Sequence, residues 1–457
     1  MGHKFPFGGA GLAFVSPDTG RDAICWISRD VTKHLARFVV DIVDRMDVSP
    51  LEQKYTGGGS APYSPRMMLA LLFYGYATGI FSSRGIERAT YELIPVLYIT
   101  GGVHPDHDSI NRFRKRFLGE LEVLFVEILE IAHYLDILSL GDISTDGTKI
   151  QGNASKHKAM SWKYACELEE RLQGEVQELL KRAETENNKE NSKVDIPEEI
   201  AHRGKRLERI AEVKEEIEKR AKTRYEEEKA EYDTKMEKRK EKEAERGKKL
   251  GGSPPKEPEP GPRPKDQVNF TDEDSRIMPT SGGDFVQGYN AQATVDMETM
   301  LVIGQYVTQN TNDKQEVEPA LAELDKLPEE LGEVKRAAFD SGYFSAFNVR
   351  VLIEKSIRAF IASGRQPHNQ PLEERLAEPP EPPKDADPVT AMQHRMKTEA
   401  GKKFYAKRKS TVEPVFGIIK EVMGFRRFML RGLEAVKGEW TLVCMAFNLK
   451  RLCVLCT

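Results

Sequence analysis

A long run of charged residues interrupts the middle of this chain and limits how the rest can fold. Over residues 161–250, Glu, Lys and Arg dominate, and apolar residues recur only at the spacing of a single helical stripe. Such a run cannot form the core of a domain, because most of its surface must stay in water. Residues prone to form β-strands lie both before and after it. We therefore predict that residues 160–265 are an insertion into a domain whose sheet comes from both sides.

The insertion has two parts that differ in composition. One helical stripe around Leu172 and another around Ile217 are separated by the helix-breaking residues 184–197. This pattern predicts two charged helices that double back on each other as a helical hairpin or coiled coil. From about Glu226 the apolar positions run out, so the second helix is expected to become a single charged arm or to fray. Residues 251–265 are rich in proline and predict an extended linker. We expect dimerisation or DNA clamping here, rather than catalysis.

Outside the insertion, β-prone segments alternate with helical ones. Strands are expected over residues 142–150, 288–296, 300–308, 334–340 and 357–362, with helices over residues 319–327 and 346–355. The residues METM between the second and third strands indicate a hairpin. A hairpin followed by helical connections predicts an α/β (α+β) fold, in which helices cover a mixed sheet. Residues 366–400 begin with a Pro-rich acidic stretch and predict a flexible acidic loop.

Short helices are expected near the amino terminus. Residues 1–60 combine a Gly- and Pro-rich arm with an amphipathic helix over residues 29–47. Residues 61–138 are predicted to form a helical domain, whose helix at 109–117 follows Asp108 as its N-cap. That helix displays four basic residues: Arg112, Arg114, Lys115 and Arg116. It is either the recognition helix of a helix-turn-helix or the solvated basic face of a helical bundle.

The net charge of the whole chain conceals a basic carboxyl-terminal end. The chain has 457 residues and a formal net charge of −4. Residues 401–457 alone carry 12 Lys and Arg against 4 acidic residues, a net charge of +8, which indicates a DNA footprint. No apolar run has the length of a membrane span, no secretory signal is evident, and five cysteines do not make a disulfide framework. We therefore expect a reduced, cytoplasmic protein.

One stretch near this end, YAKRKSTVEPVFGIIK over residues 405–420, combines the side chains that phosphodiester chemistry needs. Pro414 is tolerated only in the first turn of a helix, so Glu413 is expected at the helix start. In a continuous helix, Lys420 would lie two turns further along the same face. A carboxylate can hold a metal ion, while cationic side chains hold backbone phosphates. The alternative is a basic amphipathic helix with an incidental glutamate.

These residues resemble those of a known protein family. The order Tyr405, Arg408, Glu413 and Lys420 resembles the Y-R-E-K motif of the DDE transposases of bacterial insertion sequences. Residues 51–117 are similar to the N-terminal domain that this family is thought to use in DNA binding. Three shorter motifs are similar as well: D-G-T at 146–148, GYNAQ at 288–292 and D-x-G-Y at 340–343. The similarity is greatest to the family numbered 1182 and covers most of residues 30–160 and 270–450.

The resemblance implies an RNase H-like catalytic domain, formed by residues 139–159 and 266–450. It also implies three catalytic, metal-binding carboxylates, which by their motifs are Asp146, Asp340 and Glu413. A lone Asp near a strand end is usually a turn or capping residue, and Asp142 competes with Asp146 for the first role. In the family, the other motif side chains hold transposon-end phosphates, which here implies Tyr405, Arg408 and Lys420.

The chemistry that the resemblance implies is DNA transposition. Hard carboxylate ligands suit Mg²⁺, with Mn²⁺ as a substitute, and two ions are expected. Water as the nucleophile gives strand cleavage, and a DNA 3′-hydroxyl gives strand transfer. The expected partner is double-stranded DNA, at the transposon ends and at the target, bound by a homodimer on paired ends. The run Gly57–Gly59 lacks the Lys-Ser/Thr of a phosphate loop, so no ATP is expected.

Three other interpretations compete with an active transposase. The first is a DNA-binding derivative that no longer cuts, and the presence of all three carboxylates argues against it. The second is a structural coiled-coil protein, which would explain residues 160–250 and leave the strands and carboxylates unexplained. The third is a metal-dependent nuclease unconnected to transposition, which would not need the basic helix at 109–117.

Overall fold

The structure is a computed structural model, and it describes residues 34–55, 62–186, 196–248, 251, 253–280, 282–364, 381 and 386–456. The predicted amino-terminal arm and Gly57–Gly59 lie outside these residues. The chain forms two compact units, of which the first joins residues up to Asn153 with residues from Ile277 onward. The second unit is Ala154–Arg276, and the predicted insertion of residues 160–265 lies inside it. Residues 61–138, predicted as a domain of their own, belong to the same unit as the main sheet.

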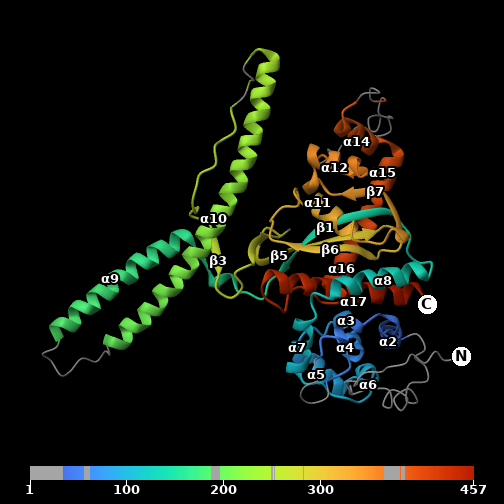
Figure 1. The fold of residues 1–457 in the computed structure, drawn as a ribbon, viewed down its shortest axis with the longest axis horizontal. Helices are drawn as coiled ribbons and strands as arrows, with labels where there is room; N and C mark the ends of the chain where they lie inside the picture. Colours follow the sequence, from blue (N-terminus) through green and yellow to red (C-terminus); the bar gives the residue numbers. More distant parts are fainter. Residues whose placement is uncertain are drawn as a thin grey trace. The chain divides into compact units, whose positions relative to one another are not determined.

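The main sheet of the first unit is mixed and has six strands (Figure 1). They are β1 (Leu140–Gln151), β4 (Arg276–Pro279), β5 (Phe285–Asp296), β6 (Val302–Thr308), β7 (Gly332–Phe339) and β8 (Arg358–Ile361). The order is β4-β5-β1-β7-β8, with β6 also paired to β5. The central strand β1 runs antiparallel to β5 and parallel to β7, and β7 runs parallel to β8. The predicted mixed α/β fold and the β5–β6 hairpin are confirmed.

The long carboxyl-terminal helix α17 (Leu433–Leu455) packs along the hairpin of this sheet. The indole of Trp440 donates a hydrogen bond to the backbone oxygen of Gln292 at 2.9 Å. The Asn448 side chain exchanges two hydrogen bonds with the backbone of Val302, at 2.7 and 2.8 Å. Most of α17 is buried, which explains why its sequence is apolar on every side.

In the part of the chain that the structure describes, the helices that accompany the second half of the sheet are α11 (Val317–Leu324), α12 (Ala346–Glu354), α14 (Pro388–Lys397) and α15 (Glu399–Ala406). Phe404 of α15 packs on Ala338 and Phe360, which share one face of β7 and β8. The flexible loop predicted over residues 366–400 is wrong from Pro388 onward, because Asp387 caps a helix there by accepting a hydrogen bond from the Val389 amide. Residues 366–380 lie outside the described chain.

Among the described residues before the sheet, the helices are α2 (Leu35–Arg45), α3 (Ser49–Glu52), α4 (Pro65–Ala77), α5 (Ser83–Glu92), α6 (Ile94–Thr100), α7 (His107–Arg116) and α8 (Leu121–Tyr134). The buried helix α4 packs against α2 and α17, which joins these helices to the sheet. Ser82 caps α5 by accepting a hydrogen bond from the Gly85 amide. The N-cap of α7 is Asp106, however, and the predicted cap Asp108 lies in the first turn. No helix in the described ranges is long and apolar enough to cross a membrane.

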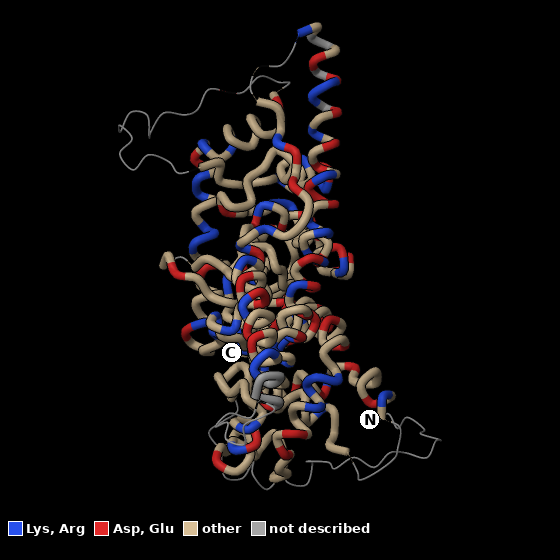
Figure 2. The backbone as a smooth tube through the Cα atoms, turned by 90° about the vertical axis from the view of Figure 1, so that its left-hand side faces the viewer, with Lys and Arg blue, Asp and Glu red and all other residues tan. Residues whose placement is uncertain are grey.

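The second unit is a hairpin of two helices, α9 (Trp162–Glu186) and α10 (Ile196–Arg246), with a short β2–β3 ladder (Ala159–Ser161 and Gln267–Asn269). Leu168 and Leu172 of α9 pack against Ile210 and Ile217 of α10. Of the two alternatives predicted after Glu226, a charged helical arm or fraying, the structure shows the helical arm, because α10 continues as one helix to Arg246. Figure 2 shows how basic and acidic residues alternate along α10.

The Pro-rich linker of the second unit runs back along α10 instead of projecting away. Arg263 of the linker pairs with Glu228 of α10 at 2.7 Å, and Lys229 of α10 pairs with Glu257 of the linker at 2.8 Å. These exposed ion pairs each contribute little to stability. Together they show that charged residues of α10 have partners within the second unit.

Candidate active site

Two of the predicted carboxylates lie side by side at the carboxyl end of the parallel strands. Thr145 of β1 pairs with Phe339 of β7. The next residues along these strands are Asp146 and Asp340, so their Cα atoms lie in neighbouring positions across adjacent strands, roughly 5 Å apart in a regular sheet. Asp340 ends its strand by capping a 3₁₀ turn (Ser341–Tyr343), and its carboxylate accepts a hydrogen bond from the Gly342 amide at 2.7 Å.

The guanidinium of Arg408 joins the third predicted carboxylate to this pair. Arg408 lies in a 3₁₀ turn (Lys407–Ser410) that follows α15. It donates to the Asp146 carboxylate at 2.6 Å and to the Glu413 carboxylate at 3.1 Å. The Arg408 side chain is only 9% exposed, whereas that of Glu413 is 48% exposed. Glu413 therefore closes the solvent side of the cluster.

The remaining two motif side chains also reach these strands. The hydroxyl of Tyr405 donates to the backbone oxygen of Phe339 at 3.1 Å, directly before Asp340. The ammonium of Lys420 donates to the Thr148 hydroxyl and to the backbone oxygen of Lys149 in β1. The structure thus places all four Y-R-E-K side chains against the carboxyl ends of β1 and β7.

The helix that carries the motif is not the uninterrupted α-helix that the sequence predicts. The α-helix α16 (Val412–Gly417) begins near Thr411 as expected, but a π-helical turn (Ile418–Val422) follows it. The Met423 amide donates to the Ile418 oxygen, five residues back, at 2.8 Å. This wider turn changes the direction in which Lys420 leaves the helix.

The electrostatics of the cluster favour bound positive charge. The pKa of Asp146 is raised to about 6. Burial is the main cause, the nearby charges of Asp340 and Asp313 act in the same direction, and Arg408 opposes them. Burial acts to lower the pKa of Arg408, but the charges of Asp146, Tyr405, Asp340 and Glu413 together outweigh it and raise this pKa overall. Burial likewise raises the pKa of the Tyr405 phenol. Even with Arg408 beside it, an ionised Asp146 is therefore costly unless a further cation is bound.

A fourth carboxylate, Asp313, belongs to this cluster, and the sequence motifs did not reveal it. It follows β6, and one of its oxygens accepts hydrogen bonds from Asn290 at 2.6 Å and from Gln292 at 2.7 Å. The ammonium of Lys149 lies 3.4 Å from the same oxygen. The Gln292 side chain also accepts a hydrogen bond from the buried Tyr343 hydroxyl. The polar run QNTND was the available signal, but such runs are usually turns.

Gly147 explains why the D-G-T motif requires glycine. A Cβ at this position would lie 2.2 Å from the Gln292 amide nitrogen and 2.7 Å from the nearer Asp313 oxygen. The side chains that hold Asp313 thus occupy the space above Gly147. The D-G-T, GYNAQ and D-x-G-Y motifs meet here through Gly147, Gln292 and Tyr343.

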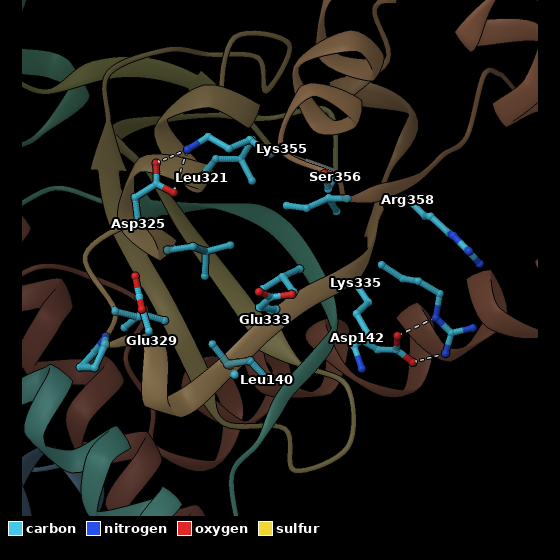
Figure 3. A pocket seen from close by; sticks show the side chains of 17 residues that line it. Leu140, Asp142, Leu321, Asp325, Glu329, Glu333, Lys335, Lys355, Ser356 and Arg358 are labelled. Atoms are coloured by element: carbon cyan, nitrogen blue, oxygen red, sulfur yellow. Dashed lines mark hydrogen bonds and ion pairs between the residues drawn. The ribbon is translucent and has the colours of Figure 1, made fainter.

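The competing candidate Asp142 lies away from this cluster. Its carboxylate pairs with the Arg336 guanidinium, whose Nε lies 2.6 Å from Oδ1 of the aspartate. Both residues line a cleft of about 1160 Å³ at the amino ends of β1, β7 and β8 (Figure 3). This cleft lies at the amino ends of the strands, whereas Asp146 and Asp340 lie toward the carboxyl ends. The structure therefore favours Asp146 over Asp142.

The four basic residues of α7 do not share one environment. Arg112, Lys115 and Arg116 lie at the surface, as the predicted basic face requires. Arg114 is buried and donates to the Tyr76 hydroxyl and to the Phe81 backbone oxygen, both at 2.9 Å. Its predicted role in DNA binding is thus wrong for this structure, because a guanidinium held this way does not reach a phosphate.

The carboxylates suit a divalent cation in kind, since all of them offer hard oxygen ligands. In the part of the chain that the structure describes, however, no three acidic, histidine or cysteine side chains lie close enough together to hold a metal ion. The reason is local, because Arg408 lies between Asp146 and Glu413 and pairs with both. The cluster therefore already surrounds one positive charge, which its own chain supplies.

Comparison with known families agrees with this geometry. The family described as "Transposase DDE domain" matches residues 383–453, which include the Y-R-E-K segment and most of α17. The family described as "Transposase domain (DUF772)" matches residues 27–116, which include α2 to α7. No curated protein and no solved structure matches the chain. The family number 1182 stays a prediction. Both matches fall in the first unit, one near each end of the chain, and together they support a DDE transposase of an insertion sequence.

Proposed function

We propose that this transposase binds the inverted repeats at transposon ends and catalyses metal-dependent DNA cleavage and strand transfer. Transposases act on DNA, and DDE domains normally use divalent metal ions. The observation that carries the proposal is the convergence of Asp146, Asp340 and Glu413 around Arg408 at one edge of the sheet. A structural role alone would not require an acidic side chain at the position of Asp146, since burying a carboxylate is unfavourable.

The topology supports an RNase H-like assignment for the sheet. Along the path β6-β5-β1-β7-β8, the first three strands are antiparallel neighbours and the last three are parallel. Ligands of open α/β sheets bind beyond the carboxyl ends of parallel strands. Asp146 lies near that end of β1, and Asp340 directly follows β7.

In this proposal, Asp146, Asp340 and Glu413 hold the cation, which is Mg²⁺ or its substitute Mn²⁺, with two ions at full occupancy. When bound, the metal supplies charge stabilisation for the phosphate oxygens in the transition state. Arg408, Tyr405 and Lys420 contact the backbone phosphates of the transposon end. Arg408 can pair with the acidic cluster and with DNA phosphates, because its planar guanidinium binds carboxylates and phosphates alike. Water is the nucleophile in cleavage, and the freed 3′-hydroxyl is the nucleophile in strand transfer.

The proposed DNA partner extends beyond the site itself. The surface basic residues of α7 are Arg112, Lys115 and Arg116, and in this proposal they add phosphate contacts that lie outside the carboxylate cluster. Paired ends would be held by a homodimer. The role of the second unit is proposed to be dimerisation or clamping of DNA, because its two helices expose charge on most of their surface.

The deciding experiment combines the purified protein with its element's end DNA and Mg²⁺, beside a Glu413→Gln control. A nick or break at the end, lost in the control, supports the metal-dependent transposase. Tight binding of the end without a cut, in Mg²⁺ and in Mn²⁺, supports the non-cleaving derivative instead. Absence of both binding and cutting contradicts the proposal.

A further inference from the structure

A short basic segment pairs with the carboxyl end of β1. Arg427 forms a parallel β-bridge with Gln151, the last residue of β1. The Gln151 amide donates to the Arg426 oxygen at 3.3 Å, and the Phe428 amide donates to the Gln151 oxygen at 2.9 Å. The segment therefore lies beside the end of the strand that carries Asp146.

A buried glutamate holds this segment in place from beneath. The carboxylate of Glu439 in α17 is fully buried and accepts hydrogen bonds from the amides of Met429 and Leu430, both at 2.9 Å. The Phe428 ring beside them is also fully buried. The backbone from 428 to 430 is therefore fixed, and the neighbouring arginines have a rigid base.

Two arginines of this segment carry charge that no carboxylate neutralises. Arg427 and Arg431 are both exposed. Arg427 donates to the side-chain oxygen of Asn153, and Arg431 donates to the Asn153 backbone oxygen at 3.0 Å. Within the described residues, neither guanidinium has an acidic side chain at ion-pair distance, whereas the neighbouring Arg426 pairs with Glu421. Asn153 is neutral, so it orients both arginines and leaves their charge available.

The position of these arginines relates them to the carboxylate cluster. Five residues of β1 separate Asp146 from Gln151, which is roughly 16 Å along an extended strand. That length corresponds to about five nucleotides of one strand of duplex DNA, at about 3.4 Å per phosphate. Lys149 and Lys420 lie between the two points and carry positive charge of their own.

We propose that Arg427 and Arg431 bind backbone phosphates of duplex DNA, about five nucleotides from the phosphodiester that reacts. This inference rests on the proposed function and adds a contact surface to it. A rigid pair of guanidinium groups on a neutral anchor suits phosphates, because phosphate oxygens accept several N–H donors at once. Contacts of this kind position the duplex and do not read its sequence.

The test measures the affinity of the full-length protein for a duplex that carries the element's end, over a range of KCl concentrations. In the Arg427→Gln, Arg431→Gln variant, the slope of log Kobs against log salt should become shallower by about 1.8, because each lost phosphate contact removes about 0.9. Hydroxyl-radical footprinting should lose protection about five nucleotides from the cut. The Arg427→Lys, Arg431→Lys variant keeps both charges and should retain the wild-type slope.

A matched control removes the same number of positive charges at the amino ends of the strands. Lys335 and Arg358 line the cleft at the amino ends of β7 and β8, and Lys335→Gln, Arg358→Gln should leave the slope unchanged. An unchanged slope in the arginine-to-glutamine variant, or an equal loss in the control, overturns the inference. If the wild-type protein binds and cuts the end while that slope is unchanged, only this inference fails. If the wild-type protein does not bind end DNA, the proposed function fails with it.

Discussion

At the scale of single residues, the site depends on the side chains that pack against β1 next to Asp146. Asp146 is flanked by a glycine whose missing side chain leaves room for Gln292 and Asp313. Those polar groups in turn surround the buried Tyr343 hydroxyl. The pairing of Asp146 with Gly147 therefore reflects a packing requirement as well as a chemical one.

Replacing Gly147 by alanine should destabilise the protein by about 1–3 kcal/mol, because the new methyl group would overlap the Gln292 amide and the Asp313 carboxylate. Urea unfolding followed by circular dichroism measures the change. Gly141 lies in the same strand, and a methyl group added there would meet no atom within 4 Å. Gly141→Ala is therefore the matched control and should be close to neutral. Equal stability of the two variants would contradict the packing around Asp313.

The raised pKa of Asp146 makes a prediction about pH. Because the folded-state pKa is about 6 and the ordinary value is 3.8, ionisation costs more in the folded protein than in the unfolded one. The stability that the protonated carboxyl contributes is present below about pH 4 and is lost as pH rises through 6. The loss amounts to about 3 kcal/mol, since one pKa unit corresponds to about 1.4 kcal/mol.

Asp146→Asn cannot ionise, so its free energy of unfolding should exceed that of the wild type by a margin that grows between pH 4 and pH 8. Urea denaturation in metal-free buffer at several pH values measures this margin, and about 2–3 kcal/mol of growth is expected. Asp142→Asn is the control, because Asp142 lies half-exposed beside Arg336. A margin that stays constant with pH would show that Asp146 is not buried as described.

The sequence predicted the central carboxylates better than their surroundings. Asp146 and Asp340 were predicted from the resemblance of two short motifs to those of DDE transposases, and each motif lies within or directly after a single strand. Asp313 was missed because its role depends on β5 side chains that no local pattern connects to it. Arg114 was assigned to a solvent-facing surface because helical spacing does not reveal that Tyr76 lies against it.

At the scale of elements, a buried polar network ties α7 to the segment that follows the motif helix. Arg114 of α7 donates to the Tyr76 hydroxyl in α4, which donates to Glu439 of α17 at 2.7 Å. Glu439 then holds the amides of Met429 and Leu430. Burial raises the pKa of Glu439, and these hydrogen bonds and Arg114 oppose that effect. The elements proposed to contact DNA are therefore joined through one buried carboxylate.

Tyr76→Phe removes the hydroxyl between Arg114 and Glu439 and leaves both partners buried. The expected loss of stability is about 1–3 kcal/mol, because a buried charged group loses a hydrogen bond without gaining water. Chemical denaturation measures it, and Tyr74→Phe on the same helix serves as the control. A loss below about 0.5 kcal/mol, the lower end for a typical hydrogen bond, would mean that the network carries little of the contact between α4, α7 and α17.

Element boundaries were predicted well where a regular pattern continues and less well where it changes. The strand expected over residues 142–150 is β1 (Leu140–Gln151), and the helix expected over residues 346–355 is α12 (Ala346–Glu354). The π-helical turn after Gly417 could not be predicted, because the same residues are compatible with a continuous α-helix. The helix at Pro388 follows an acidic Pro-rich stretch, and that composition masked it.

At the scale of the whole molecule, two units with separate cores are expected to unfold separately. Ile210 lies in the core of the second unit, against α9. Ile210→Ala should lower the stability of that unit by about 2–5 kcal/mol and leave the first unit unchanged. Calorimetry of the full chain should show two transitions, of which one shifts. A single transition, or a shift of both, would show that the two units are coupled.

The central claim is that catalysis takes place at the carboxyl ends of β1 and β7 and not at their amino ends. Cleavage of end DNA in Mg²⁺ by Asp146→Asn and by Asp142→Asn tests it most directly, because both residues lie on the same strand. Asp146→Asn should lower the cleavage rate roughly a thousandfold, equivalent to several kcal/mol of transition-state stabilisation, and Asp142→Asn should change it little. Full activity of Asp146→Asn, or the reverse order of the two variants, would contradict it.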